Sequence, residues 1–317
     1  MDRVVVGIDL GGTIVRAGVF DGQGSLLVVR ETPIEAARGP EFGLGKIQAL
    51  VKQVLTESEA QTLAGIGIGA TGPVDPIRGT IHNPFTLPGW DNVPITDWLQ
   101  NKFQVPVTLE NDADAAALGE YWQGAGQHAK RLYAVTVGTG IGTALIADGQ
   151  IYRGLDGSHP EGGHMVLDPA GPLCYCKARG CWESLCAGPA IERQARAMDL
   201  TGSQLLEMSA GEPDKIDARL IFESARRKDP LALALVERTV DYFSQGILNI
   251  AILFVPDVIV LSGGVMRSIE FFLPAVQETL QTHTDMVPAD RIQVVPARLG
   301  YYAGLYGGAY TIFRKNL

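Results

Sequence analysis

The sequence predicts an α/β protein in which one strand-rich unit occurs twice. Residues 3–31 consist of Val- and Ile-rich runs separated by glycine turns, which is typical of three consecutive strands. Residues 131–154 repeat the same order of strands and turns. Alanine-rich composition at 113–124, and apolar residues spaced by three and four at 230–255, indicate helices.

The remaining elements follow in chain order. In the first half we expect a helix, then a buried strand that ends in a turn, then another strand, at about 41–58, 63–76 and 106–112. Helical patterns recur at 187–197 and 214–226, and Pro256 ends the long helix. In the last part we expect a strand with a glycine turn at 257–265, followed by a helix. A strand at 291–297 and a closing helix at 301–313 follow.

These elements predict two domains. The first comprises residues 1–116 together with the closing helix in 301–317, and the second comprises residues 117–300. A length of 317 residues is ordinary for two domains.

Composition and charge exclude several classes of protein. Hydrophobic residues make up 46% of the chain and charged residues 19%, which is enough for a buried core. The formal net charge of −9 argues against general nucleic-acid binding, because that needs a basic face. The longest apolar run, 247–255, is half of what a membrane span needs, and the first residues do not resemble a signal peptide. We therefore expect a cytoplasmic protein with no membrane or nucleic-acid partner.

Three glycine turns, each after an apolar strand, predict a nucleotide site. In the first, glycines would let backbone N–H groups approach a phosphate, Thr13 would add a hydroxyl, and Asp9 could hold Mg²⁺. Alone, this stretch could also be a plain hairpin with a solvated aspartate. The second and third turns follow the same plan, and the candidate residues of all three are Asp9, Gly11, Gly12, Thr13, Gly138, Thr139, Gly140, Gly142, Gly263 and Gly264.

Another glycine pattern is misleading. Gly67, Gly69 and Gly72 spell the dinucleotide-binding fingerprint G-x-G-x-x-G. That motif must open a helix, and Pro73 and Pro76 follow immediately. We therefore interpret it as the end of a strand where backbone approaches a ligand.

Three of the four cysteines lie within eight residues of one another and predict a metal site. His164, Cys174, Cys176 and Cys181 have the spacing H-x9-C-x-C-x4-C, which suits a tetrahedral zinc ion. The alternatives are small buried hydrophobic residues, which we expect only of Cys186, or a disulfide, which the short separation of Cys174 and Cys176 would strain. Zinc would fix a segment that has little regular structure of its own.

At this point the motifs resemble a known family. The stretches GIDLGGT, VTVGTGIG, EGGH followed by CYCKARGCWE, and LSGGV occur in the order found in ROK family sugar kinases. The resemblance covers nearly the whole chain and implies the two-lobed actin-like ATPase (ribonuclease H-like) fold, which accounts for the duplicated α/β unit. It also implies ATP and Mg²⁺ as nucleotide and cofactor, and a homodimer or homotetramer.

The resemblance further implies the site residues. LENDADAAALGE matches the segment that carries the catalytic base, so Asp112 would accept the proton of the sugar 6-hydroxyl. The other interpretation of Asp112 is a helix cap shared with Asn111, and Asp114 would be only a first-turn charge. The positions that match sugar contacts are Gly72, Asn111, Glu161, His164 and Glu183. His164 would bind zinc through one ring nitrogen and face the sugar with the other.

Some residues depart from the family pattern and leave the hexose undecided. Thr86 stands where asparagine is usual, and the pair His159-Pro160 is similar to fructokinase-like members, whereas the cysteine array is similar to glucokinase-like ones. Ile14 and Tyr302 also differ from the pattern.

The function that we expect is ATP-dependent phosphorylation of a hexose, most of all glucose. Fructose, mannose and N-acetylmannosamine are alternative substrates within the family. A sugar-sensing transcriptional regulator is the alternative of another class, and we expect no helix-turn-helix domain because the first strand begins at residue 3. An actin-like or chaperone ATPase is disfavoured by the cysteine cluster and by the residues Glu110, Asn111 and Asp112.

Overall fold

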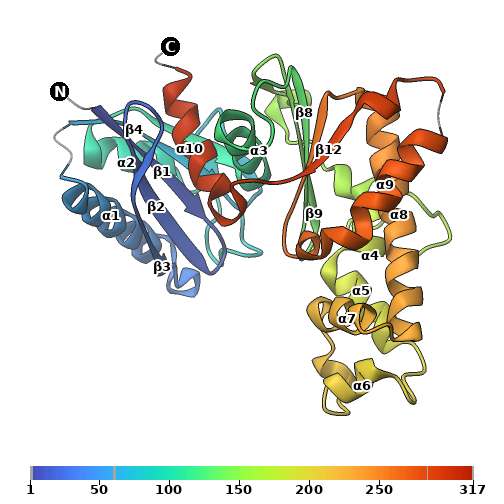
Figure 1. Cartoon of the computed structure of the whole chain (residues 1–317). Coiled ribbons are helices and arrows are strands. Elements are labelled where there is room, and N and C mark those ends of the chain that lie inside the picture. Colours follow the sequence, from blue (N-terminus) through green and yellow to red (C-terminus); the bar gives the residue numbers. More distant parts are fainter. Residues whose placement is uncertain (1–2, 60–61, 284, 316–317) are drawn as a thin grey trace. The chain divides into compact units, whose positions relative to one another are not determined.

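A computed structural model describes residues 3–59, 62–283 and 285–315. The chain forms two compact units (Figure 1), and each is described by itself. The first unit contains Met1–His128, Ala144–Pro160 and Arg298–Leu317, and the second contains Ala129–Thr143 and Glu161–Ala297. None of the helices in the described ranges has the length and apolar character needed to cross a membrane.

The first unit is built on a five-stranded mixed sheet. Its order is β3-β2-β1-β4-β7, with β1 antiparallel to β2, β2 antiparallel to β3, and β1, β4 and β7 parallel. The strands are β1 (Arg3–Leu10), β2 (Ile14–Phe20), β3 (Leu26–Pro33), β4 (Thr62–Ala70) and β7 (Val107–Asn111), and the hairpin strands β5 (Val74–Asp75) and β6 (Thr80–Ile81) form a separate pair. The helices are α1 (Pro40–Glu57), α2 (Ile95–Phe103), α3 (Asp112–Gln123) and α10 (Ala303–Phe313).

Helix α10, from the end of the chain, packs directly on the first sheet (Figure 1). A Cβ atom at Gly67 of β4 would lie 1.7 Å from the carbonyl oxygen of Gly308, and one at Gly7 of β1 would lie 2.2 Å from that of Leu305. Glycines at these strand positions therefore let the helix backbone touch the sheet. Buried strand side chains such as Ile8, Ile66 and Leu109 belong to a hydrophobic core cluster that also includes residues of α1 and α2.

A second five-stranded sheet repeats this topology. The strands are β8 (Arg131–Val137), β9 (Ile141–Ala147), β10 (Gln150–Ile151), β11 (Val258–Ser262) and β12 (Gln293–Pro296), in the order β10-β9-β8-β11-β12. When the strands of each sheet are numbered along the chain, both sheets have the order third, second, first, fourth, fifth. The duplication predicted from the glycine turns is therefore confirmed.

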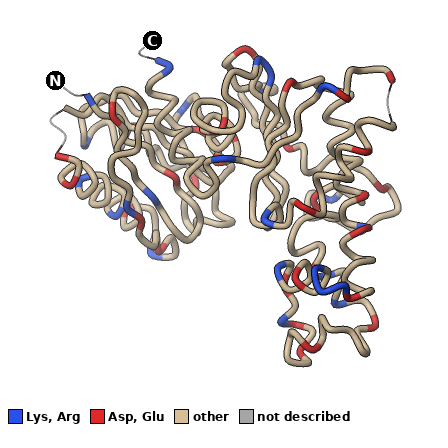
Figure 2. Tube along the Cα trace, in the orientation of Figure 1, with Lys and Arg blue, Asp and Glu red and all other residues tan. Residues whose placement is uncertain are grey.

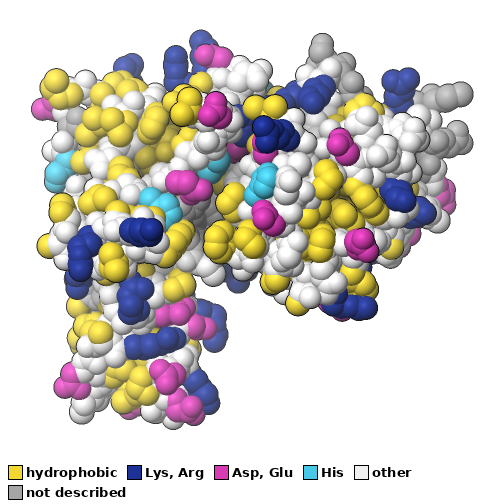
Figure 3. Space-filling model, turned by 180° about the vertical axis from the view of Figure 1, so that it is seen from behind, with side chains coloured by type: hydrophobic (Ala, Val, Ile, Leu, Met, Phe, Trp, Pro, Cys, Tyr) yellow, Lys and Arg dark blue, Asp and Glu magenta, His cyan; other side chains and the backbone are white. Residues whose placement is uncertain are grey.

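The helices of the second unit surround one long central helix. They are α4 (Trp182–Cys186), α5 (Gly188–Arg196), α6 (Gln204–Met208), α7 (Ala218–Arg226), α8 (Pro230–Phe254) and α9 (Ile269–Thr282). In the core, Phe243 of α8 lies between Trp182 and Phe272, with ring centroids 5.4 and 5.1 Å away. Figure 2 shows acidic and basic residues interspersed along α5 to α7, and the face in Figure 3 shows apolar side chains scattered among polar ones.

Short 3-10 turns connect these elements. They lie at η1 (Ala36–Arg38), η2 (Leu155–Gly157), η3 (Gly162–His164), η4 (Pro213–Lys215), η5 (Val265–Ser268), η6 (Ala289–Arg291) and η7 (Gly300–Tyr302). Gly67 and Gly69, from the misleading G-x-G-x-x-G pattern, lie in strand β4. A turn follows at Gly72, and no helix begins there.

The structure divides the chain at different residues from the expected ones, and Ala144–Pro160, which we expected in the second domain, belongs to the first unit. A boundary at 116/117 would cut α3, which instead packs as a whole against α10. The return to the first unit comes at Arg298 rather than residue 301. The buried Glu120 carboxylate accepts hydrogen bonds from the backbone N–H groups of Arg298 and Leu299, at 3.0 and 2.7 Å, and so holds that point of the chain against α3.

We predict that Gly67→Ala destabilises the protein by about 1–3 kcal/mol, because the new Cβ overlaps the α10 backbone. Gly45→Ala in α1 is the matched control, since a Cβ there meets no atom within 4 Å. The control should be stabilising by about 0.5–1 kcal/mol, as is usual for glycine replaced inside a helix. Urea unfolding of both variants measures this, and equal stability of the two would show that α10 does not rest on β4 as described.

Candidate functional site

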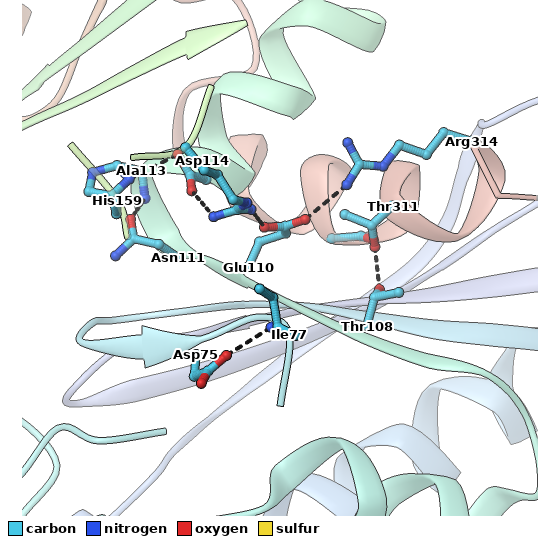
Figure 4. A network of polar contacts seen from close by, with 12 residues as sticks. Asp75, Ile77, Thr108, Glu110, Asn111, Ala113, Asp114, His159, Thr311 and Arg314 are labelled. Carbon is cyan, nitrogen blue, oxygen red and sulfur yellow. Dashed lines mark hydrogen bonds and ion pairs between the residues drawn. The ribbon is translucent and has the colours of Figure 1, made fainter. Parts of the chain in front are cut away.

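The turn between β7 and α3 carries the predicted base. Asn111 caps the helix, because its side-chain oxygen accepts the N–H of Ala113 at 2.8 Å. Asp112 also accepts this N–H, at 2.9 Å, and its side chain remains accessible. Asn111 (labelled in Figure 4) therefore provides the capping geometry, and Asp112 stands at the helix start with an exposed side chain.

The pKa of Asp112 is raised to about 6. Desolvation by the surrounding protein is the largest cause, and the negative charge of Asp9 adds to it. The Ala113 N–H and the His159 side chain act in the opposite direction. Above pH 6 the group is ionised, and its proton affinity is then higher than that of an ordinary aspartate, as a general base near neutral pH requires.

Gly72 lies against the same turn. A Cβ atom at this position would be 2.6 Å from the Asn111 side-chain nitrogen, so the backbone of Gly72 and the Asn111 amide are in contact distance. Nearby in the sequence, the buried Asn83 orders its loop by donating to Thr86 Oγ1 at 2.6 Å and to the Thr71 carbonyl at 3.1 Å. The structure thus brings Gly72 and Asn111 together and gives Thr86 a role within its own loop.

Beside the first glycine turn, an arginine that the sequence analysis did not identify pairs with Asp9. Arg16 of β2 forms an ion pair with Asp9 and donates a second hydrogen bond to Glu31, at 2.9 Å. Its guanidinium carbon lies 3.4 Å from the ring centre of Tyr301. Burial nevertheless raises the pKa of Asp9, and Arg16 only partly offsets this. A cation bound at Asp9 would therefore share the carboxylate with Arg16.

Gly11 and Gly12 form the tight turn expected of them, and Thr13 is exposed beside them. The N–H of Gly11 donates to the Ile14 carbonyl at 3.0 Å, and a Cβ at Gly12 would lie 3.0 Å from the Thr86 carbonyl. A side chain at position 12 would therefore make a tight contact with Thr86, which glycine avoids.

The second and third glycine turns lie next to each other in the second unit. They follow the adjacent parallel strands β8 and β11, which are joined near their ends by a 2.7 Å hydrogen bond between the Thr136 and Ser262 hydroxyls. Gly263 has φ +97° and packs against the backbone of Val137. A Cβ at Gly138 or Gly264 would meet no atom within 4 Å, so backbone in both turns borders open space. Thr139 and Gly140 complete the second turn, and Gly142, which we expected in the turn, lies in β9.

Glu183 connects the cysteine segment to the second glycine turn. Its Oε2 accepts the N–H of Ile141 at 2.9 Å, and a Cβ at Gly140 would lie 2.3 Å from the same oxygen. The glycine at 140 is thus needed for the carboxylate to approach. One oxygen of Glu183 is used in this contact.

The four predicted metal ligands come together. The ligand atoms of His164, Cys174, Cys176 and Cys181 lie within 4.8 Å of one another. The His164 Nδ1–Cys174 Sγ and Cys176 Sγ–Cys181 Sγ distances are both 3.5 Å. Ligands on a tetrahedral Zn²⁺ are about 3.5–3.8 Å apart, given metal–ligand distances near 2.0–2.3 Å, so the set fits zinc. All four cysteines are free thiols, and Cys186 is buried outside the cluster, as expected.

Tyr175, between two of the cysteines, is a residue that the sequence analysis missed. Its hydroxyl lies 3.1 Å from His164 Nε2, the nitrogen that faces away from the cysteines. Desolvation and the carboxylates of Glu183 and Glu161 raise its pKa to about 12. The phenol therefore lies beside three of the predicted sugar contacts.

Comparison with known proteins identifies the family. Residues 5–315 match the model of the ROK family. The chain belongs to the ROK family. A glucokinase from Thermotoga maritima is 34% identical over 97% of this chain and 96% of its own length. A ROK hexokinase from Thermus thermophilus has a TM-score of 0.82 at 35% identity, over 99% of each chain.

A second solved structure contains ligands. A ROK family glucokinase from Streptomyces griseus, in complex with glucose and AMPPNP, has a TM-score of 0.78 at 32% identity, over 98% of this chain and 99% of that one. These matches show that the ROK protein described here is glucokinase-like and has the predicted actin-like ATPase fold.

We predict that one aspartate of this ROK protein titrates near pH 6 and that the signal is lost in Asp112→Asn. Because the pKa of Asp112 in the folded protein is above the ordinary aspartate value of 3.8, the native state binds the proton more tightly, so the contribution of Asp112 to stability falls as pH rises from about 4 through 6. The variant should therefore be more stable than the parent at pH 8 and not at pH 4. Carboxyl-carbon NMR and thermal unfolding measure both effects, and a pKa near 4 would contradict them.

Proposed function

We propose that this ROK protein transfers the γ-phosphoryl group of ATP to the 6-hydroxyl of a hexose, with glucose as the preferred substrate. The observation that carries the proposal is the accessible Asp112 carboxylate at the start of α3, with a pKa of about 6. The glucokinase from Thermotoga maritima supports the choice of glucose. Fructose, mannose and N-acetylmannosamine remain the alternative substrates.

The proposed reaction needs one proton acceptor. The 6-hydroxyl donates a hydrogen bond to ionised Asp112 and passes its proton there as the oxygen attacks the γ-phosphorus. The new O–P bond forms as the bond to the ADP oxygen breaks, and ADP leaves with that electron pair. Bound Mg²⁺ would neutralise phosphate charge, with Asp9 as the candidate carboxylate. Most of the acceleration comes from alignment, because phosphoryl transfer needs little from a base.

Backbone and polar side chains supply the binding groups. The phosphates would be held by backbone N–H groups and hydroxyls at Gly11, Gly12, Thr13, Gly138, Thr139, Gly140, Gly142, Gly263 and Gly264. The sugar hydroxyls would be bound by Gly72, Asn111, Glu161, His164 and Glu183. In this proposal Tyr175 is an additional sugar contact, since its hydroxyl already lies at hydrogen-bond distance from His164.

The proposed metal is a structural zinc ion held by His164 Nδ1 and the thiolates of Cys174, Cys176 and Cys181. It would fix the segment that carries His164 and lead the chain into α4, where Glu183 lies. Ring nitrogen Nε2 of His164 stays free of the metal and can face a hydroxyl group. Zinc here organises the sugar site and takes no part in phosphoryl transfer.

The first test is turnover with Mg-ATP and a panel of glucose, mannose, fructose, allose and N-acetylmannosamine. We expect the highest kcat/KM with glucose, and a decrease in kcat of about 10²–10⁴-fold in Asp112→Asn with sugar binding retained. Asp97→Asn, an exposed first-turn aspartate of α2, is the control and should keep its activity. A sugar-binding protein with no turnover would favour the regulator, and a kcat in Asp112→Asn equal to that of the parent would remove Asp112 as base.

The second test concerns zinc. We expect about one zinc per chain by elemental analysis, and loss of zinc in Cys176→Ser but not in Cys186→Ala, which lies outside the cluster. Removal of zinc should weaken sugar binding without weakening ATP binding, measured by calorimetry. Unchanged sugar affinity in zinc-free protein would contradict the organising role.

A further inference from the structure

A buried group of charges surrounds the turn that carries Asp112. The Glu110 and Asp114 side chains are only 5% and 1% exposed. Arg153 and Arg314 are about one-fifth exposed, and His159 is 13% exposed. All five residues belong to the first unit. We call this group the 110–114 ion network, and Figure 4 shows His159 beside Asp114 and Arg314 beside Glu110.

Each carboxylate oxygen of the network has a donor. Arg153 bridges the two acids, with Nη2 on Glu110 Oε2 and Nη1 on Asp114 Oδ2 at 3.1 Å. His159 Nδ1 lies 3.0 Å from Asp114 Oδ1. Arg314 Nη2 donates to Glu110 Oε1 at 2.9 Å. Buried charges are costly unless they are paired in this way, so the removal of one member leaves another uncompensated.

The network joins residues that lie on both sides of Asp112 in the sequence. Glu110 is on β7 and Asp114 is in the first turn of α3, so the two acids bracket Asn111 and Asp112 in the sequence. The guanidinium of Arg153 joins them and thereby fixes the distance across the turn. The backbone at Asp112 therefore lies between Glu110 and Asp114, which are joined through the same arginine side chain.

The network also holds a segment that has almost no regular structure. Residues 152–160 contain only the short 3-10 turn η2, and Tyr152 and Leu155 are 52% and 84% exposed. Arg153 and His159 are the residues of this segment that reach the two buried acids. A positive charge on His159 also acts to lower the pKa of Asp112. The segment continues directly into Glu161.

We propose that Arg153 and His159 are positioning residues for the general base, because the 110–114 ion network holds Asp112 and residues 152–160 in one fixed arrangement. The inference rests on the proposed function, in which Asp112 accepts the proton of the sugar hydroxyl. Neither residue touches the reacting atoms in this account. Their effect is on kcat, through the alignment of the Asp112 carboxylate, and not on the affinity for ATP.

The test compares Arg153→Met with Arg153→Lys, and His159→Leu with His159→Gln. We expect kcat to decrease by about 10–100-fold in the Met and Leu variants, since misplacement of a catalytic group by ~1 Å can cost that much. KM for ATP should stay within about twofold. Gln keeps an N–H donor for Asp114, and Lys keeps the positive charge, so these variants should recover part of kcat. Arg219→Met, on an 80% exposed arginine, is the neutral control.

Folding is checked first, because breaking a buried ion pair can cost about 3–5 kcal/mol. Assays are made below each variant's unfolding temperature, confirmed by circular dichroism. If Arg153→Met does not fold, the His159 pair decides. Folded His159→Leu or Arg153→Met with kcat within twofold of the parent would overturn the inference. So would equal losses in each conservative variant and its non-conservative partner, or a decrease confined to KM.

The experiments distinguish a failure of this inference from a failure of the proposed function. If the parent phosphorylates glucose and Asp112→Asn abolishes this, while the network variants retain kcat, the base assignment stands and the positioning role is wrong. If the parent phosphorylates no hexose, or Asp112→Asn retains kcat, the proposed function fails and this inference fails with it.

Discussion

The position of α3 depends on the close backbone packing of the closing helix. A Cβ at Gly307 of α10 would lie 1.6 Å from the carbonyl oxygen of Ala115, and one at Gly119 would lie 2.2 Å from that of Ala303. The two helices therefore touch through their backbones, while α10 also rests on β1 and β4. The N-terminus of α3, where Asp112 lies, is fixed by a segment that is almost two hundred residues away in the sequence. Gly119 and Gly307 therefore support the proposed function indirectly, because they allow the helix packing that places Asp112.

Electrostatics adds a second constraint at the same place. The negative charge of Asp9 raises the pKa of Asp112, and desolvation raises the pKa of both carboxyl groups. The protein compensates each acid differently: Arg16 pairs directly with Asp9, whereas Asp112 has only a backbone N–H and the more distant His159. Asp112 therefore keeps a raised pKa without a direct ion-pair partner, and the 110–114 ion network keeps other charges in place around it.

Local patterns in the sequence were sufficient for much of this structure. Val- and Ile-rich runs with glycine turns predicted both sheets, and the spacing of His164, Cys174, Cys176 and Cys181 predicted their convergence, because these residues are close in the chain. Pairings over long separations could not be predicted. Arg153 meets acids 39 and 43 residues away, and Arg314 meets Glu110 across 204 residues. Asp114 therefore looked like a simple first-turn charge, although it is a buried member of the network.

The central claim is that Asp112 receives the proton of the sugar hydroxyl. A crystal structure of this ROK protein with glucose and a non-hydrolysable ATP analogue tests it most directly. We expect a carboxylate oxygen of Asp112 at hydrogen-bond distance from the 6-hydroxyl, about 2.6–3.2 Å, with the γ-phosphorus on the far side of that oxygen. A 6-hydroxyl bonded to a different acid, with Asp112 turned away from the sugar, would contradict the claim.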